Sequence, residues 1–376
     1  MKLIKLIKKF IRTNKQYKPF YIINLKKIIK IYKKWLLYLP LVKPYYAVKC
    51  NNNKKILKLL SDLGCSFDCA SKEEIKTILN ITNDPSRIIF ANPCKIPSHI
   101  KYASNNDVDY MTFDCEEELY KIKKYHPNSK LILRIAVDDS YSICKFNIKF
   151  GSKLEDVNKL IKIMKNLDLN LSGFSFHVGS GCNSDIIYYD ALKSCREAFD
   201  IAVSNNYSHN IDIIDIGGGF QDNDNFIKIT MNINKGLNDF FKYEIDNKII
   251  NVIAEPGRFF VEKSHTLVLN VIGKKKSGNE FKYYLNDGVY GSFNCIIFDH
   301  KIPIIKSLHT PTPSTEEYTS KFFGPTCDSI DLIADNIKFH ELNIGDYIYI
   351  PNFGAYTYSA SSSFNGFKTK SFKYYI

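Results

Sequence analysis

Two glycine-containing segments in the second half of the chain have the residue types that bind a phosphate group. Gly217-Gly218-Gly219 and Gly257-Arg258 each follow a short apolar run. Glycines let backbone N–H groups approach an oxyanion closely, and an arginine adds a charged, bidentate hydrogen-bond donor. Glycine turns are common, but the two segments together predict a phosphate-binding site.

Three other polar residues that follow apolar runs could use a cofactor held at such a site. Lys49 follows the apolar residues 45–48, and a lysine at the mouth of an apolar interior is costly unless it is paired or reacts covalently. Beside a phosphate site, this residue favours a Schiff base with pyridoxal phosphate. Glu255 would hold a proton on the pyridine nitrogen, and His177 could stack on the ring. The plainer alternatives are a solvated strand-end lysine and a hydrogen-bonded core histidine.

These residues lie at the ends of eight apolar runs that recur between residues 43 and 258. The runs are residues 44–49, 65–71, 87–93, 109–114, 130–137, 172–180, 211–219 and 251–258. Amphipathic, helix-like segments separate most of them. Eight such units predict an α/β fold with a (β/α)8 TIM-like barrel, whose active site lies at the carboxyl ends of the strands. The loops after strands seven and eight, which contain the glycine segments, are the usual phosphate site of this barrel.

Helix starts within this region are predicted from capping-box spacing. The three candidate pairs are Ser71 with Glu74, Asp114 with Glu117, and Ser152 with Glu155. We therefore expect each serine or aspartate to cap the helix that follows it.

The sequence changes in character after about residue 262, where short alternating runs and turn residues predict strands. We expect a barrel domain over residues 25–262 and a C-terminal all-β domain, a modified barrel or sandwich, over residues 263–376. Residues 1–24 are expected to join the β domain. Within them, the first eleven residues fit an amphipathic helix. Packing as an ordinary terminal element is favoured over binding to a membrane surface.

Composition excludes several classes of protein. The net charge of +13 would suit a polyanion, but the lysines are spread along the chain and no nucleic-acid-binding motif is present, so no nucleic-acid partner is expected. The ten cysteines have no C-x-x-C pair and no zinc-ligand spacing, which predicts thiols in a reducing compartment and no metal site. Lysines interrupt every apolar run near the N-terminus, so neither a signal peptide nor a membrane span is expected. The predicted location is cytoplasmic.

Eight motifs, in order along almost the whole chain, carry a resemblance to a known family. They are YAVKCN (46–51), FDCAS (67–71), FHVGSGC (176–182), DIGGGF (215–220), EPGR (255–258), DGVYGSFNCIIFDH (287–300), GPTCDSID (324–331) and FGAYTYSASSSFNGF (353–367). The sequence resembles the eukaryotic-type ornithine decarboxylases, pyridoxal-phosphate enzymes built from a barrel and a β domain. The resemblance implies decarboxylation of L-ornithine to putrescine and CO2, a step of polyamine biosynthesis.

The resemblance also implies roles for individual residues. Lys49 would form the Schiff base, His177 would stack on the cofactor, and Glu255 would pair with the pyridine nitrogen. The other cofactor-binding residues that it implies are Asp68, Arg134, Ser180, Gly218, Gly219, Arg258 and Tyr356.

Cys327 matches the family's catalytic cysteine, which protonates the substrate's α-carbon. Taken without its context, it would be interpreted as a small buried residue. Asp299 and Asp328 match the two carboxylates that bind the distal ammonium of ornithine, and Phe364 matches an aromatic residue lining that pocket. In this family the cysteine segment enters the active site of the partner subunit, so a homodimer with shared active sites is implied. An antizyme is a further possible partner.

Two other interpretations stay open. The same chemistry could act on lysine or arginine, although some arginine-specific relatives have a longer acid where Asp299 stands. The chain could also be a non-catalytic homologue like the antizyme inhibitors, which have lost cofactor or catalytic residues. One position departs from the family pattern, because Phe298 stands where many relatives have tyrosine.

Overall fold

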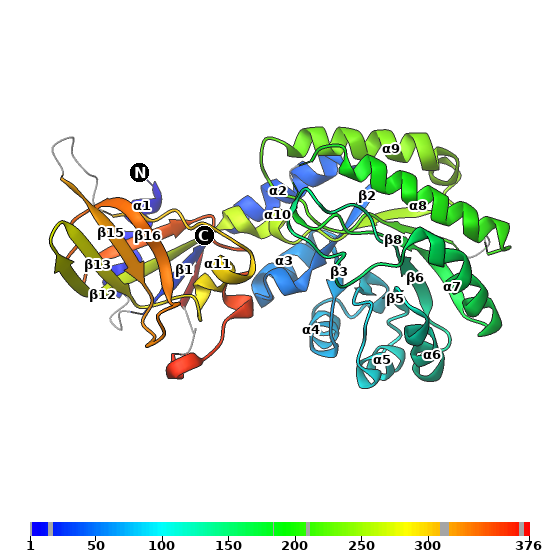
Figure 1. The fold of residues 1–376 in the computed structure, drawn as a ribbon, viewed down its shortest axis with the longest axis horizontal. Helices are drawn as coiled ribbons and strands as arrows, with labels where there is room; N and C mark the ends of the chain where they lie inside the picture. The colour runs from blue at the N-terminus through cyan, green and yellow to red at the C-terminus, as the bar shows by residue number, and fades with distance from the viewer. Residues whose placement is uncertain (1, 14–17, 183, 208–210, 309–315, 368–371) are drawn as a thin grey trace. The chain divides into compact units, whose positions relative to one another are not determined.

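A computed structural model describes the whole chain except residues 1, 14–17, 183, 208–210, 309–315 and 368–371. It divides into two compact units (Figure 1). One unit contains residues 31–259, and the other contains residues 1–30 together with 260–376.

The unit formed by residues 31–259 is a parallel barrel. In the part of the chain that the structure describes, eight strands close into one sheet, each paired in parallel with its neighbours. In their order around the barrel the strands are β2 (Val42–Ala47), β3 (Ser66–Cys69), β4 (Ile88–Phe90), β5 (Tyr110–Phe113), β6 (Lys130–Arg134), β8 (Asn170–Ser175), β10 (Ile213–Asp215) and β11 (Asn251–Ala254). The predicted (β/α)8 fold is therefore confirmed, and each of the eight apolar runs contributes one strand.

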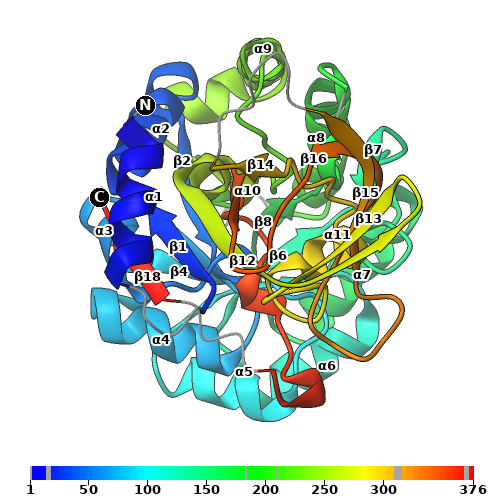
Figure 2. The ribbon, with the colours of Figure 1, turned by 90° about the vertical axis from the view of Figure 1, so that its left-hand side faces the viewer.

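Helices surround this barrel, as the view in Figure 2 shows. They are α2 (Leu25–Tyr38), α3 (Lys54–Asp62), α4 (Lys72–Thr82), α5 (Pro97–Ser104), α6 (Glu116–Tyr125), α7 (Leu154–Asn166), α8 (Ile187–Ser204), α9 (Phe226–Asp246) and the short α10 (Arg258–Val261). A short antiparallel pair, β7 (Ser142–Cys144) with β9 (Ser180–Cys182), lies outside the barrel sheet. Apolar residues at helical spacing produce the buried helix faces, for example Val157, Leu160, Ile161 and Met164 of α7.

The other unit is built on a mostly antiparallel sheet. Its strands are β1 (Phe20–Ile23), β12 (His265–Ser277), β13 (Glu280–Leu285), β14 (Lys306–Ser307), β15 (Glu317–Phe323), β16 (Leu332–His340), β17 (Tyr347–Pro351) and β18 (Phe372–Tyr375). β1, from near the N-terminus, pairs antiparallel with β12 and parallel with β18. The predicted all-β domain is confirmed.

The N-terminal helix α1 (Lys2–Thr13) packs on this sheet. Ile7 is completely buried in a cluster with Phe20 and Val268, and the Phe10 ring stacks on the Tyr374 ring at a centroid distance of 3.9 Å. The apolar face of α1 is therefore covered by its own unit, as expected of a packed terminal element.

Only one of the three predicted helix caps has the expected geometry. The Ser71 hydroxyl accepts a hydrogen bond from the Glu74 N–H at the start of α4. The prediction for Asp114 is wrong, because Cys115 stands at the N-cap of α6 and Asp114 accepts instead from the Gly151 N–H, at 2.8 Å. The prediction for Ser152 is also wrong, because Lys153 is the N-cap of α7 and provides no side-chain hydrogen bond.

Two further findings concern predictions from composition. The ten cysteines all lie in the part of the chain that the structure describes, and none of them forms a disulfide there. Among the same residues, no helix is both long enough and apolar enough to cross a membrane.

Candidate active site

Lys49 lies in a single helical turn, Val48–Cys50, that directly follows β2. Its Nζ atom forms an ion pair of 2.5 Å with Oδ2 of Asp68, which is completely buried in the neighbouring strand β3. The lysine side chain itself is 44 % exposed. The ion pair fixes the direction of the amine at the carboxyl end of the barrel, where a ligand can still reach it.

His177 follows β8 and is electrically neutral. Its Nδ1 atom accepts a hydrogen bond of 3.0 Å from the Gly179 N–H, which leaves the proton on Nε2. Burial, and then the charges of Arg134 and Lys49, hold the pKa of His177 well below its usual value. The ring therefore offers a neutral face and one N–H donor.

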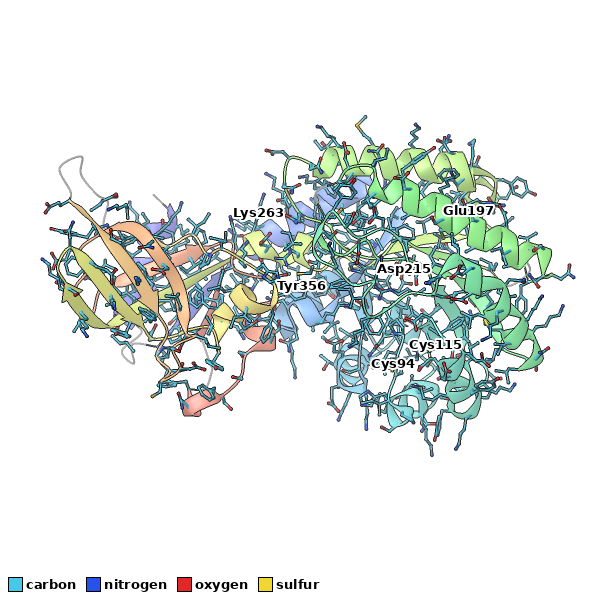
Figure 3. All side chains as sticks on the ribbon, viewed as in Figure 1. Cys94, Cys115, Glu197, Asp215, Lys263 and Tyr356 are labelled. Atoms are coloured by element: carbon cyan, nitrogen blue, oxygen red, sulfur yellow. The ribbon has the colours of Figure 1, made fainter. Side chains whose placement is uncertain are left out.

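Arg134, His177, Asp215 and Glu255 line one interior pocket at the carboxyl ends of the strands. Burial, and then the charges of Asp215 and Asp68, raise the pKa of Glu255 well above its usual value. Burial also raises the pKa of Asp215, which lies among the barrel strands (Figure 3), to about 7. A cationic group bound between these carboxyls would stabilise their charged forms.

The glycine turn after β10 brings backbone close to this pocket. Gly217 has a φ of +65°, and a Cβ there would lie 2.1 Å from the Phe176 carbonyl oxygen. A Cβ on Gly218 would lie 2.8 Å from the Nε2 atom of His177. Tyr188 fixes the turn from behind, since its hydroxyl donates to the Gly218 carbonyl at 2.7 Å. No residue larger than glycine fits these two positions without movement of the backbone.

The β unit contains a second group of candidate residues. The Tyr290 hydroxyl donates a short hydrogen bond to Oδ2 of Asp328, and this bond lowers the pKa of the Asp328 carboxyl. The Tyr290 ring stacks on Phe364, with centroids 4.3 Å apart and planes inclined by 24°. Oδ1 of Asn365 accepts from the Cys327 N–H at 3.0 Å. The structure thus brings together Cys327, Asp328 and Phe364 from two segments far apart in sequence.

Asp331 holds the segment that contains Cys327 and Asp328. It is 1 % exposed, and its carboxylate accepts from the Val289 N–H at 2.7 Å, the Thr326 N–H at 3.0 Å and the Thr326 hydroxyl at 2.7 Å. A Cβ on Gly324 or Gly288 would lie only 2.2 or 2.1 Å from this carboxylate. The motifs DGVYGSFNCIIFDH and GPTCDSID therefore each have a glycine at the position that the Asp331 carboxylate contacts.

A model of a known protein family matches residues 25–262, and its description is pyridoxal-dependent decarboxylase, pyridoxal binding domain. The chain belongs to this family. Ornithine decarboxylase of Schizosaccharomyces pombe is 46% identical over 337 residues, which cover 87% of this chain and 76% of that protein. The cofactor of this decarboxylase is pyridoxal 5′-phosphate.

Two other similar proteins are named for different activities. The solved structure of Paramecium bursaria Chlorella virus arginine decarboxylase bound to agmatine has a TM-score of 0.94 and 39% identity, and the match covers 99% of this chain and 100% of that one. Antizyme inhibitor 2 of Xenopus laevis is 43% identical over 85% of this chain and 73% of its own length. The family thus includes proteins with different substrates and at least one named for inhibition.

The pocket of this decarboxylase fits its cofactor chemically. Several buried polar atoms have no hydrogen-bond partner among the described residues, and they include Nε and Nη2 of Arg134, Oγ1 of Thr112 and Oγ of Ser175. Native structures leave few such atoms without a partner, and these three residues line the pocket with Glu255. Bound pyridoxal phosphate would supply hydrogen-bond partners to polar groups of this kind.

The other predicted site residues lie at the starts or ends of short elements or in a loop. Ser180 begins β9, and Arg258 begins α10 and is 9 % exposed. Asp299 ends the short helix α11 (Cys295–Phe298), and its N–H donates to the Cys295 carbonyl at 3.1 Å. Tyr356, in the β unit, has a φ of +53°. A tyrosine rarely adopts this left-handed conformation, and strained positions of this kind cluster at functional sites.

Three residues of the decarboxylase were missed or left undecided by sequence reasoning. Asp215 and Asp331 lie inside motifs that carry the resemblance, yet neither was assigned a role. Tyr290 was not assigned either, although it contacts both Asp328 and Phe364. The available signal was that Asp215 and Asp331 each share a motif with glycine, namely DIGGGF and GPTCDSID.

Replacement of Asp215 by asparagine should change how stability depends on pH in the cofactor-free decarboxylase. The folded protein holds a proton on Asp215 up to about pH 7, whereas an unfolded aspartate releases it near pH 4. Stability contributed by this difference is therefore lost as the pH rises between those values. Asp215→Asn should reduce that loss when unfolding by urea is measured from pH 4 to 8. Equal pH slopes in the two proteins would show that Asp215 does not titrate in this way.

Replacement of Asp331 by asparagine should destabilise the β unit, because an amide nitrogen would face donors that now meet a carboxylate oxygen. We expect a loss of about 2 kcal/mol of unfolding free energy, measured by urea denaturation. Asp335→Asn on the exposed face of β16 is the matched control, and it should cost less than about 0.5 kcal/mol. Similar effects of the two substitutions would contradict the role given to Asp331.

Proposed function

We propose that this protein decarboxylates L-ornithine to putrescine and CO2. The observation that carries the proposal is the geometry around Asp328: the Tyr290 hydroxyl donates to its Oδ2 atom, and the Tyr290 ring stacks on Phe364. A carboxylate oriented in this way beside an aromatic ring suits the distal ammonium of a diamino acid. The 46% identity to the Schizosaccharomyces pombe ornithine decarboxylase supports the same substrate.

In this proposal each residue of the barrel pocket has one task. Pyridoxal phosphate, when bound, supplies an electron sink for the charge left on the substrate's α-carbon. Lys49 would attach the cofactor through Nζ, held in direction by Asp68. Glu255 would pair with the pyridine nitrogen, and the neutral His177 would lie on the ring face. Arg134 would use its unpaired donors on the cofactor.

Other residues would complete phosphate binding and proton transfer. The phosphate would be held by Ser180, Gly218, Gly219, Arg258 and Tyr356. Cys327, which is exposed in the single chain, would return a proton to the α-carbon after CO2 leaves. Asp299 and Asp328 would bind the distal ammonium beside Phe364.

We also propose a homodimer in which Cys327 and Asp328 act in the active site of the partner subunit. Tyr290 and Asp331 would then be positioning residues, because they hold the segment that crosses to the partner. Analytical ultracentrifugation tests the proposal: a dimer is expected, and a fully active monomer would contradict it. An antizyme would be a further partner of the same protein.

Arginine and lysine are the rival substrates. The structural match to the arginine decarboxylase covers 99% of this chain, so the fold alone does not distinguish an ornithine decarboxylase from an arginine decarboxylase. Asp299 favours ornithine over arginine, because some arginine-specific relatives have a longer acid at this position.

The alternative to an enzyme is a non-catalytic, inhibitor-like protein. The similarity to antizyme inhibitor 2 is the reason to consider this alternative. Retention of Lys49 with its Asp68 partner argues against it. Purified protein should show a visible absorption band that borohydride abolishes, and it should release putrescine from ornithine. A colourless protein that gains no band with added pyridoxal phosphate would overturn the enzyme proposal.

A further inference from the structure

The barrel has a second cavity, of about 570 Å³, at the amino ends of its strands. Its lining includes Tyr110 and Lys130, the first residues of β5 and β6, and Lys43 near the start of β2. Because all strands of the barrel are parallel, these residues lie at the end opposite to Glu255 and His177. The volume is in the range that holds small organic ligands.

An apolar layer inside the barrel separates this cavity from the catalytic pocket. Tyr45, Ile89, Ile132, Ile213 and Ile253 pack together, and all five are buried. Three members of this layer, Tyr45, Ile213 and Ile253, also line the cavity, whereas none of the five lines the pocket around Glu255. The cavity is therefore a site of its own and not an extension of the active site.

The charge on the cavity wall is positive. Lys43, Lys130 and Lys248 line it, and no carboxylate does. None of the three lysines forms an ion pair within the described residues. The Nζ atoms of Lys43 and Lys130 instead lie 5.6 and 5.0 Å from the ring centroids of Tyr45 and Tyr110. Three ammonium groups around one opening, none of them in an ion pair among the described residues, favour an anionic ligand.

Two acidic side chains near the cavity accept hydrogen bonds from protein groups. Oδ2 of Asp212 accepts from the Tyr110 hydroxyl at 2.7 Å, whereas its buried Oδ1 has no hydrogen-bond partner among the described residues. Oδ1 of Asp84 accepts from both the N–H and the hydroxyl of Ser86, at 3.0 and 2.6 Å. One oxygen of each carboxylate therefore already meets a protein donor.

A further cation adds to the positive potential. Nη2 of Arg87 donates to the Ser61 carbonyl at 2.8 Å, which holds the guanidinium near Lys43. Partial burial, and then the charge of Arg87, lower the pKa of Lys43. A bound anion would relieve this repulsion and favour the charged ammonium.

We propose that this cavity, at the amino ends of the barrel strands, binds a small multivalent anion of the phosphate class. Lys43, Lys130 and Lys248 would supply the charge, and the Tyr45 and Tyr110 rings would form the wall behind it. The site does not depend on which amino acid the protein decarboxylates.

The test is calorimetric titration of the protein loaded with pyridoxal phosphate, which keeps the catalytic phosphate site filled. Inorganic pyrophosphate at low salt is the probe. We expect one site per chain in the wild type, and a loss of affinity of about tenfold or more in each of Lys43→Gln and Lys130→Gln. Lys193→Gln on α8 removes the same charge from an exposed position outside the cavity and should bind as the wild type does.

Lys248→Asn provides a variant with little risk to folding. Lys248 is exposed and has a φ of +56°, a conformation that asparagine adopts readily. It should also weaken pyrophosphate binding, with an unchanged melting temperature in the absence of the probe. The proposal is overturned if the wild type binds no pyrophosphate, if Lys193→Gln weakens binding as much as the cavity variants, or if binding survives all three cavity substitutions.

Discussion

Lys49→Ala should lower turnover by about a thousandfold or more, equivalent to about 4 kcal/mol of barrier, and should abolish covalent attachment of pyridoxal phosphate. The reason is that Nζ of Lys49 is the amine that the ion pair with Asp68 directs at the carboxyl end of the barrel. Putrescine release and the visible absorption band of the purified protein measure the two effects.

Lys49→Arg separates the covalent role from a purely structural one. The guanidinium can keep the ion pair with Asp68 but cannot attach the cofactor covalently. We therefore expect Lys49→Arg to be as inactive as Lys49→Ala, with a melting temperature close to that of the wild type. Lys76→Ala, at an exposed position of α4, should retain full turnover. An active Lys49→Arg variant would show that only the ion pair matters.

Cys327→Ala should slow turnover by about a hundredfold while cofactor binding is unchanged. Without an acid at this position, the α-carbon is protonated slowly or the proton goes elsewhere. Release of CO2 should then exceed formation of putrescine, whereas the wild type should give the two in equal amounts. Simultaneous measurement of labelled CO2 and putrescine gives this ratio directly.

Two other cysteine variants control for this result. Cys327→Ser keeps the size of the side chain but is a much weaker acid, so it should resemble Cys327→Ala. Cys94→Ala removes an exposed thiol of the barrel unit and should leave both rate and product ratio unchanged. If Cys327→Ala kept the full rate and equal amounts of the two products, another group would have to be the acid.

The barrel could be predicted because its determinants are local. Eight apolar runs with helix-like segments between them define the strands, and polar residues mark the strand ends. Lys49 and His177 were predicted at strand ends, and the structure places both shortly beyond β2 and β8. The short helical turn around Lys49 does not show in the pattern, because one turn has no periodicity.

The sequence could not distinguish between chemically identical residues that differ only in burial. In the segment IDIIDIGGG, Asp212 and Asp215 flank two isoleucines. The three-residue strand Ile213–Asp215 places them at opposite ends of the barrel, one bonded to Tyr110 and the other buried beside Glu255. Their different surroundings depend on neighbouring strands, which single-sequence reasoning does not supply.

Helix caps and long-range hydrogen bonds were difficult to predict from sequence for the same reason. Asp114 had the spacing of an N-cap, but it reaches the Gly151 N–H, 37 residues away. Tyr290 could not be paired with Asp328 from spacing either, because 38 residues separate them. Such partners are fixed by the tertiary fold and not by the local sequence.

Turnover of L-ornithine, L-lysine and L-arginine by the purified, cofactor-loaded protein tests the proposed function most directly. The carboxylates Asp299 and Asp328 would bind a distal ammonium, and residue 299 is an aspartate where some arginine-specific relatives have a longer acid. We expect kcat/KM for ornithine to exceed that for lysine and arginine by about tenfold or more, a difference of about 1.4 kcal/mol. If lysine or arginine is decarboxylated as efficiently as ornithine, the proposed substrate is wrong.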